Sequence, residues 1–250
     1  MRLSVVIPCF YGGQDLCGAI EKIAALGYDA AETYDWKGLD FPRVREACER
    51  HGVELVSVCT THFNMTDPAK RAEWLKGLEE SCEAANKLGA GKLITQCGPD
   101  TGMPRSEQRR SISQALKEAG PILAEHAVTL MIEPLNALVD HPGCYLTGSE
   151  EAFSIVREAG DEHVKMVFDI YHQQVMEGNI IPNITANLDC IAHLHAAGHP
   201  GRHELQAGEN DYRVIFAAAG RAGYGGCCGL EYKPLTDTEE SLREARRLYG

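Results

Sequence analysis

Residues 191–204 read IAHLHAAGHPGRHE, an apolar run that breaks into a loop rich in glycine and proline. The run is typical of a buried strand, and the glycines and proline are typical of the loop after it. His193 and His195 lie two residues apart, so both point to the same face of that strand. The loop adds Arg202 and Glu204 near the strand's carboxyl end. This pattern indicates a polar site, although hydrogen-bonded core histidines beside a solvated loop would give the same sequence.

Short apolar runs and amphipathic segments alternate in this way along the whole chain. Strands are expected at residues 3–7, 30–33, 53–59, 92–96, 128–132, 164–168, 191–196 and 227–231. Helices are expected at residues 14–26, 42–51, 68–88, 106–126, 149–159, 212–222 and 239–249, with helical pieces between 171 and 188. Apolar strands between amphipathic helices indicate a parallel sheet covered by helices. Eight such units in 250 residues predict an α/β fold with one domain over residues 1–250, a single (β/α)8 TIM barrel. No GxGxxG motif follows the first strand, which weighs against an open nucleotide-binding sheet.

The composition narrows the classes of function. The chain has 24 basic and 36 acidic residues and a formal net charge of −12, which argues against nucleic acid as a partner. A small anionic substrate needs only one or two local cations and stays compatible with this charge. No apolar run approaches about 18 residues, so no membrane segment is expected. The start, MRLSVVIPCF, has no small-residue cleavage site after it, and the ten scattered cysteines form no CxxC pair. Both features favour a cytoplasmic protein with reduced thiols.

Four consecutive strands end in a side chain that can bind a metal ion. MIEPLN places Glu133 after the fifth strand and VFDIYH places Asp169 after the sixth; the seventh provides His195, and GLEYKP places Glu231 after the eighth. Alone, each side chain could form a salt bridge at the barrel rim or cap a helix. Together, three carboxylates at one rim would repel one another unless a cation lay between them. This set of oxygen and nitrogen donors suits one divalent ion, Mn²⁺ or Mg²⁺, with Co²⁺ or Zn²⁺ as alternatives.

Five motifs point to a family. IEPLN, FDIYH, HPGRHE, the GENDY stretch at 208–212 and GLEYKP resemble the xylose-isomerase-like TIM barrels, in particular their hydroxypyruvate isomerase and 2-oxo-tetronate isomerase branch. The resemblance covers essentially the whole chain and is strongest between residues 131 and 234. It implies that Glu133, Asp169, His195 and Glu231 hold a single divalent ion. It also implies that Glu133 and Glu231 face each other across the substrate and act as acid and base.

The substrate side of the site is expected partly from the resemblance and partly from residue chemistry. The resemblance implies that His172 and Arg202 contact substrate oxygens and that Glu204 supports the arginine loop. The planar guanidinium of Arg202 matches a carboxylate, unless it pairs on the surface with a nearby glutamate. A carboxylate partner favours a hydroxy-oxo acid over a neutral sugar. Trp36 and His62 follow the second and third strands, where either a pocket wall in contact with substrate or plain packing is expected.

The expected reaction is the isomerisation of a short hydroxy-oxo acid, of the hydroxypyruvate to tartronate semialdehyde type. One glutamate removes a proton from carbon, an enediolate forms, and a carboxylic acid returns a proton to the adjacent carbon. The sequence leaves open which of Glu133 and Glu231 acts first.

Three alternative functions use the same fold. His195 stands where the resemblance leads us to expect Gln in hydroxypyruvate isomerases and His in ketose 3-epimerases, so a ketose 3-epimerase with the same ion and glutamates is one alternative. An abasic-site endonuclease needs ligands for three metal ions, and the chain offers ligands for one. A non-catalytic binding barrel would not need both Glu133 and Glu231. The resemblance also allows a homo-oligomer, a dimer or a tetramer.

Overall fold

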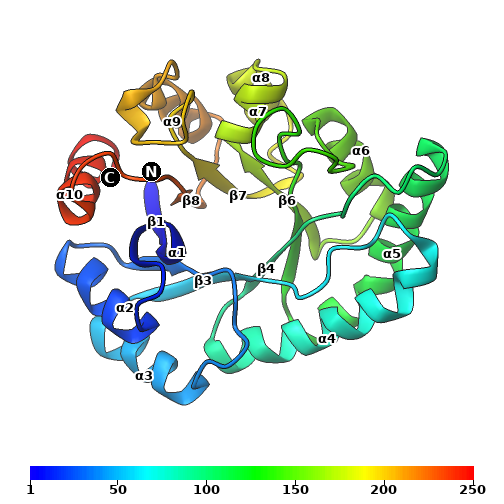
Figure 1. Cartoon of the computed structure of the whole chain (residues 1–250), viewed down its shortest axis with the longest axis horizontal. Helices are drawn as coiled ribbons and strands as arrows, with labels where there is room; N and C mark the ends of the chain where they lie inside the picture. The colour runs from blue at the N-terminus through cyan, green and yellow to red at the C-terminus, as the bar shows by residue number, and fades with distance from the viewer.

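Eight parallel strands close into a barrel in chain order, with the helices outside it, in the computed structural model of residues 1–250 (Figure 1). The strands are β1 (Arg2–Val6), β2 (Ala30–Glu32), β3 (Glu54–Cys59), β4 (Lys92–Thr95), β5 (Thr129–Ile132), β6 (Val164–Asp169), β7 (Ile191–Ala196) and β8 (Cys227–Leu230). The helices are α1 (Ile7–Tyr11), α2 (Leu16–Ala25), α3 (Phe41–His51), α4 (Arg71–Leu88), α5 (Arg105–His126), α6 (Ser149–Ala159), α7 (Ile170–Met176), α8 (Ile180–Ala186), α9 (Tyr212–Arg221) and α10 (Thr238–Tyr249), with 3₁₀ helices η1 (Pro68–Lys70) and η2 (Leu205–Ala207). This arrangement confirms the predicted (β/α)8 barrel. No helix combines the length and apolar composition needed to cross a membrane.

The structure departs from the expected elements directly after β1, and it contains the helical pieces that were expected after β6. Helix α1 follows β1 directly, where no helix was expected. It begins with Ile7-Pro8 and has only five residues, so it is too short to show a helical period in the sequence. The helical pieces after β6 are two short helices, α7 and α8, which are separated at Gly178. Gly178 adopts a positive φ of 67°, a conformation that favours glycine and ends the first piece.

Aspartate side chains begin five of the helices. Their carboxylates accept backbone N–H bonds from the first turn of α2, α3, α7, α9 and α10, and the residues are Asp15, Asp40, Asp169, Asp211 and Asp237. Each such cap is worth about 1 kcal/mol. Asp169 belongs to this group, with Oδ1 accepting from the N–H groups of Tyr171 and His172. The capping role leaves its second oxygen free for other chemistry.

The strand register brings polar residues together inside the barrel. His195 on β7 pairs with Gly229 on β8, and Gly229 pairs with Ser4 on β1. Glu32 on β2 pairs with Ser57 on β3, where the register of the two strands shifts. All of these polar side chains are buried. A barrel interior is normally filled by branched apolar side chains, so a polar layer at this level needs a specific hydrogen-bond arrangement.

Candidate functional site

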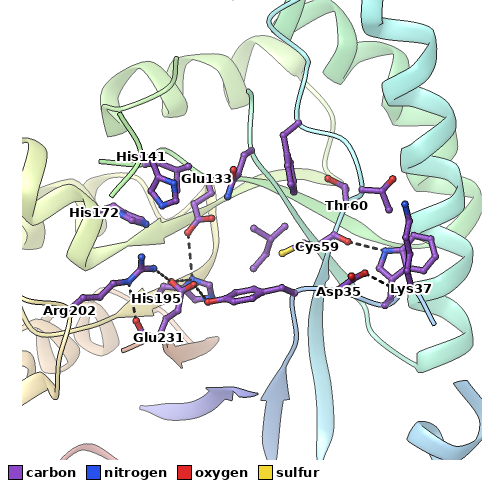
Figure 2. Close-up of a pocket in the computed structure, with 17 residues that line it drawn as sticks. Asp35, Lys37, Cys59, Thr60, Glu133, His141, His172, His195, Arg202 and Glu231 are labelled. Carbon is purple, nitrogen blue, oxygen red and sulfur yellow. Dashed lines mark hydrogen bonds and ion pairs between the residues drawn. The ribbon is translucent and has the colours of Figure 1, made fainter. Parts of the chain in front are cut away.

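A pocket of about 480 Å³ lies at the carboxyl ends of the strands. Its lining consists of Tyr34, Asp35, Trp36, Lys37, Cys59, Thr60, Thr61, Phe63, Ile94, Gln96, Glu133, Leu135, His141, His172, His195, Arg202 and Glu231. Figure 2 shows two ends. Glu133, His141, His172, His195, Arg202 and Glu231 gather at one, and Asp35, Lys37, Cys59 and Thr60 lie at the other. The volume suits a small molecule, and the position is the one at which TIM barrels carry their chemistry.

Three carboxylates meet at the first end of the pocket. One possible ligand atom from each of Glu133, Asp169, His172 and Glu231 lies within 4.8 Å of the others, and all four side chains are buried. Burial and the neighbouring charge of Glu231 raise the pKa of Asp169 to about 6. The ionised form loses water and faces another anion, which makes it less stable. A divalent cation at this point would remove the repulsion, so the donor set fits a metal ion.

His195 lies between these carboxylates and the barrel interior. Its Nδ1 atom is 3.6 Å from a Glu133 oxygen and 3.3 Å from a Glu231 oxygen, and it is buried without a hydrogen bond. Burial disfavours a charged ring, but the carboxylates of Glu32 and Glu231 outweigh it and raise the pKa of His195. A positive charge is therefore favoured at Nδ1, whether a proton or a metal ion supplies it.

The four predicted ligands thus lie together. The four residues whose possible ligand atoms lie within 4.8 Å of one another include His172 in place of the predicted His195. His195 approaches two members of that group from the side of the barrel interior.

Glu231 is held by two side-chain donors, and the Nδ1 atom of His195 lies beside it. The Tyr34 hydroxyl donates to Oε1 at 2.6 Å and Arg202 Nη2 donates to Oε2 at 2.7 Å, while His195 Nδ1 is 3.3 Å away. Burial favours the neutral acid, but His195 and Arg202 outweigh it and lower the pKa of Glu231. Glu133 has only the His195 contact at 3.6 Å as an ion pair. The two glutamates therefore differ, because Tyr34 and Arg202 hold Glu231 as an anion and no such donors hold Glu133.

His172 is oriented by Asn136 of the IEPLN motif. The Asn136 oxygen accepts from the backbone N–H groups of Val139 and Asp140, at 3.1 and 2.9 Å. These bonds fix the amide, so its nitrogen donates to His172 Nδ1 at 2.6 Å. Burial lowers the pKa of His172 to about 4, and the neutral ring then carries its proton on Nε2. That nitrogen lies 3.5 Å from Asp169 Oδ2, so His172 is a hydrogen-bond donor at the carboxylate end of the pocket.

Two residues expected on the substrate side of the site, Glu204 and His62, do not line the pocket. Glu204 is buried, and its carboxylate accepts from the Leu235 N–H at 2.9 Å and from Ser241 Oγ at 3.0 Å. It therefore fixes the segment between β8 and α10. His62 lies in the loop after β3 and its Nδ1 is 3.6 Å from Glu73 on α4, whereas its neighbours Thr61 and Phe63 line the pocket.

Trp36 and Arg202 both line the pocket. Trp36 lines the far end, and its Nε1 donates to the Cys59 carbonyl at 3.1 Å. Arg202 also lines the pocket and pairs with Glu231. Arg202 therefore pairs with Glu231 inside the pocket and not with a loop glutamate at the surface.

Several residues of the site were not predicted from the sequence. Tyr34, His141 and Asn136 were not singled out, and neither was Glu32 below the pocket. A usable signal for two of them was the segment AAETY at residues 30–34, in which an acid ends an apolar strand. An acid in a fully buried strand needs partners, so that segment predicts a buried polar network.

Comparisons with known proteins agree on the fold. A family model described as a xylose isomerase-like TIM barrel matches residues 20–249. A hydroxypyruvate isomerase from Escherichia coli K12 is 30% identical and covers 97% of each chain. A 2-oxo-tetronate isomerase from Pectobacterium atrosepticum is 32% identical and covers 80% of each chain. A crystal structure described as an AP endonuclease of family 2 from Brucella melitensis superimposes with a TM-score of 0.91 at 22% identity over 97% of each chain; at that identity it shows the fold alone.

Proposed function

The chain belongs to the xylose isomerase-like TIM barrel family, and from that premise we propose that it is a metal-dependent isomerase of short hydroxy-oxo acids. The reaction is of the hydroxypyruvate to tartronate semialdehyde type, and it moves a proton between adjacent carbons with no net gain or loss of electrons. The relatives described as hydroxypyruvate isomerase and 2-oxo-tetronate isomerase support this substrate class.

One observation carries the proposal. The buried carboxylates of Glu133, Asp169 and Glu231 converge at the pocket, and the unpartnered Nδ1 of His195 points at two of them. These four side chains would hold one divalent ion, with Mn²⁺ or Mg²⁺ as the expected metal. When bound, the ion would act as a Lewis acid toward the oxygens of an α-hydroxy carbonyl substrate.

The protein's own residues would move the protons. The carboxylates of Glu133 and Glu231 lie close together at the pocket and are placed to remove a proton from one carbon and to return it to the next. The Nε2–H group of His172 would donate to the substrate oxygen on which charge develops. Tyr34 and Arg202 would hold Glu231 in position through the bonds they donate to it.

The cationic residues favour an acid as the substrate. Arg202 and Lys37 are the cationic side chains among the residues that line the pocket. Arg202 uses Nη2 for the Glu231 carboxylate and Nε for the Glu231 carbonyl, and its Nη1 group would bind a substrate carboxylate. Lys37 lies at the opposite end and would attract an anion toward the pocket.

His195 favours a second candidate. The resemblance leads us to expect His at this position in ketose 3-epimerases, so a ketose 3-epimerase with the same ion and the same glutamates is the alternative. The two functions differ in the substrate and share the proton-transfer chemistry.

Turnover after metal removal and replacement tests both. The protein is stripped with a chelator, reloaded with Mn²⁺ or Mg²⁺, and offered hydroxypyruvate, 2-oxo-tetronates and free ketoses in parallel, with Glu231→Gln as a control. We expect metal-dependent conversion of an oxo acid that is lost in the variant. Conversion of neutral ketoses alone would assign the protein to the epimerases and remove the carboxylate role of Arg202. Full turnover by the stripped protein would refute the metal-dependent mechanism.

A further inference from the structure

A fully buried glutamate lies inside the barrel, below the pocket. Glu32 on β2 accepts four hydrogen bonds, two on each carboxylate oxygen. Oε1 accepts from Ser4 Oγ at 2.6 Å and contacts His193 Nε2 at 2.9 Å. Oε2 accepts from Ser57 Oγ at 2.7 Å and contacts His195 Nε2 at 3.1 Å. A buried carboxylate is costly unless it is fully satisfied, and this one is.

These contacts decide which nitrogen of His195 carries a proton. An ionised carboxylate can only accept hydrogen bonds, so the His195 nitrogen that faces Glu32 must be Nε2–H. The other nitrogen, Nδ1, then keeps its lone pair for a ligand when the ring is neutral. Nδ1 is the atom aimed at Glu133 and Glu231. Glu32 thus presents the lone pair of His195 to the place where the carboxylates converge.

Gly229 on β8 makes room for this pair. A Cβ atom at position 229 would lie 2.5 Å from Glu32 Oε1 and 2.7 Å from His195 Cδ2. Both distances are well below van der Waals contact, so any larger residue would displace the carboxylate or the ring. The glycine two residues before Glu231 therefore has a steric role inside the barrel, independent of the hydrogen bonds.

We propose that Glu32 is the positioning residue of the metal site. By holding Nε2 of His195, it makes Nδ1 the atom that would bind the metal, in a carboxylate–histidine–metal arrangement. Gly229 provides the space for this pair. The inference deepens the proposed function and needs a divalent ion at Glu133, Asp169 and Glu231. Glu32, His193 and His195 do not themselves form a second metal site, because both Glu32 oxygens are already occupied by protein donors. A partner of this kind orients the ligating ring and raises its basicity.

Metal affinity tests the proposal without any substrate. The Kd for Mn²⁺ or Co²⁺ is measured by chelator competition in the wild type, in Glu32→Gln and in Gly229→Ala. In either orientation of the amide, Glu32→Gln removes the charge that polarises His195, so we expect affinity to fall by roughly 10- to 100-fold. We expect Gly229→Ala to weaken binding in the same direction. Glu151→Gln is the control, because Glu151 is a half-buried carboxylate on α6 that accepts from the Tyr145 hydroxyl at 3.1 Å and does not line the pocket, and the Kd of this variant should match the wild type.

Long-range proton–nitrogen NMR of the Zn²⁺-loaded wild type reads the tautomer directly. We expect a proton on Nε2 of His195 and none on Nδ1. A proton on Nδ1, or an unchanged Kd in both Glu32→Gln and Gly229→Ala, overturns the proposal. If Glu32→Gln does not fold, Gly229→Ala and the wild-type spectrum still decide. If the wild type converts the oxo acid but the Kd is unchanged in both variants, only this inference is refuted. If the Kd changes in the variants but the wild type converts no oxo acid, only the proposed substrate is refuted.

Discussion

The two ends of the pocket are built in different ways. At the charged end, β5, β6, β7 and β8 each deliver one ionisable side chain, Glu133, Asp169, His195 and Glu231. At the far end, the segments after β2 and β3 each contribute several neighbouring wall residues, among them Lys37 and Thr60 (Figure 2). The charged end therefore depends on where strands stop, and the far end depends on how loops pack.

This difference predicts a division of labour. Side chains fixed at strand ends hold a rigid geometry, which proton transfer and metal binding require. Loop residues vary in shape more easily and select substrates. Tyr34 crosses the division, since it comes from the far side and donates to Glu231. Substitutions at the charged end should therefore lower turnover, whereas those at the far end should mainly raise KM.

The largest effect is expected for the two glutamates. Glu133→Gln and Glu231→Gln should each lower kcat by roughly two to four orders of magnitude, because each removes a proton-transfer group. Only Glu231→Gln should also lower the Tm markedly, because it leaves Arg202 without its carboxylate partner. Steady-state kinetics and thermal melts check both. Near-normal turnover in Glu133→Gln would show that the charged end works with one glutamate.

Asp169 separates metal binding from folding within the charged end. Asp169→Asn keeps an oxygen to cap α7 but loses the charge, so Kd for Mn²⁺ should rise more than about 100-fold, given that outer-shell changes alone cost 10- to 100-fold. Its free energy of unfolding without metal should stay close to that of the wild type. Asp169→Ala should lose the cap as well, which costs about a further 1 kcal/mol. Chelator competition and urea unfolding measure the two quantities, and equal stability of the two variants would contradict the capping role.

The same division explains how much the sequence could predict. The barrel follows from the alternation of periodic segments, and the approach of Glu133, Asp169, His195 and Glu231 follows from strand ends meeting at one rim. For His62 the sequence left both a pocket wall and plain packing open, because loop side chains do not follow a period and the sequence does not tell which of Thr61, His62 and Phe63 faces inward. Glu32 escaped notice because its partners come from β1, β3 and β7, which only the closed barrel brings together.

His172 should make the charged end sensitive to acid. Its folded pKa is about 4, against 6.5 for the ordinary ring, so between these values the unfolded chain binds a proton that the native ring does not. The stability that neutral His172 contributes is present above about pH 6.5 and is lost as the pH falls toward 4. Between pH 7 and pH 5 the loss is roughly 2 kcal/mol. Urea unfolding of the metal-free protein at both pH values should show this contribution as the difference in slope between the wild type and His172→Gln, because the raised pKa of Asp169 adds a slope of opposite sign to both proteins; parallel slopes would refute it.

Tyr34 tests whether the far side contributes to the charged end. Tyr34→Phe removes the hydroxyl that donates to Glu231 at 2.6 Å and keeps the ring as a wall. A hydrogen bond to a charged group is worth about 1.5–3 kcal/mol, so kcat/KM should fall at least about tenfold. The loss should appear mainly in kcat, since the bond is to a catalytic group and not to substrate. A change confined to KM would place Tyr34 with the other wall residues and sharpen the division between the two ends.

The smallest effect is expected at Trp36, which belongs wholly to the far end. Trp36→Phe keeps an aromatic wall and loses only the Nε1 bond to the Cys59 carbonyl, which is worth about 1 kcal/mol of stability. KM should change less than about fivefold, because roughly 1 kcal/mol corresponds to a factor of about five, and kcat should stay the same. Trp36→Ala opens the wall and should raise KM further, again with little change in kcat. Steady-state kinetics on the substrate identified by turnover decide the matter. A tenfold fall in kcat for Trp36→Phe would mean that the far end also determines the geometry of the reacting groups. Removing one remote hydrogen bond can slow proton transfer only by shifting Glu133, Glu231 or the substrate between them.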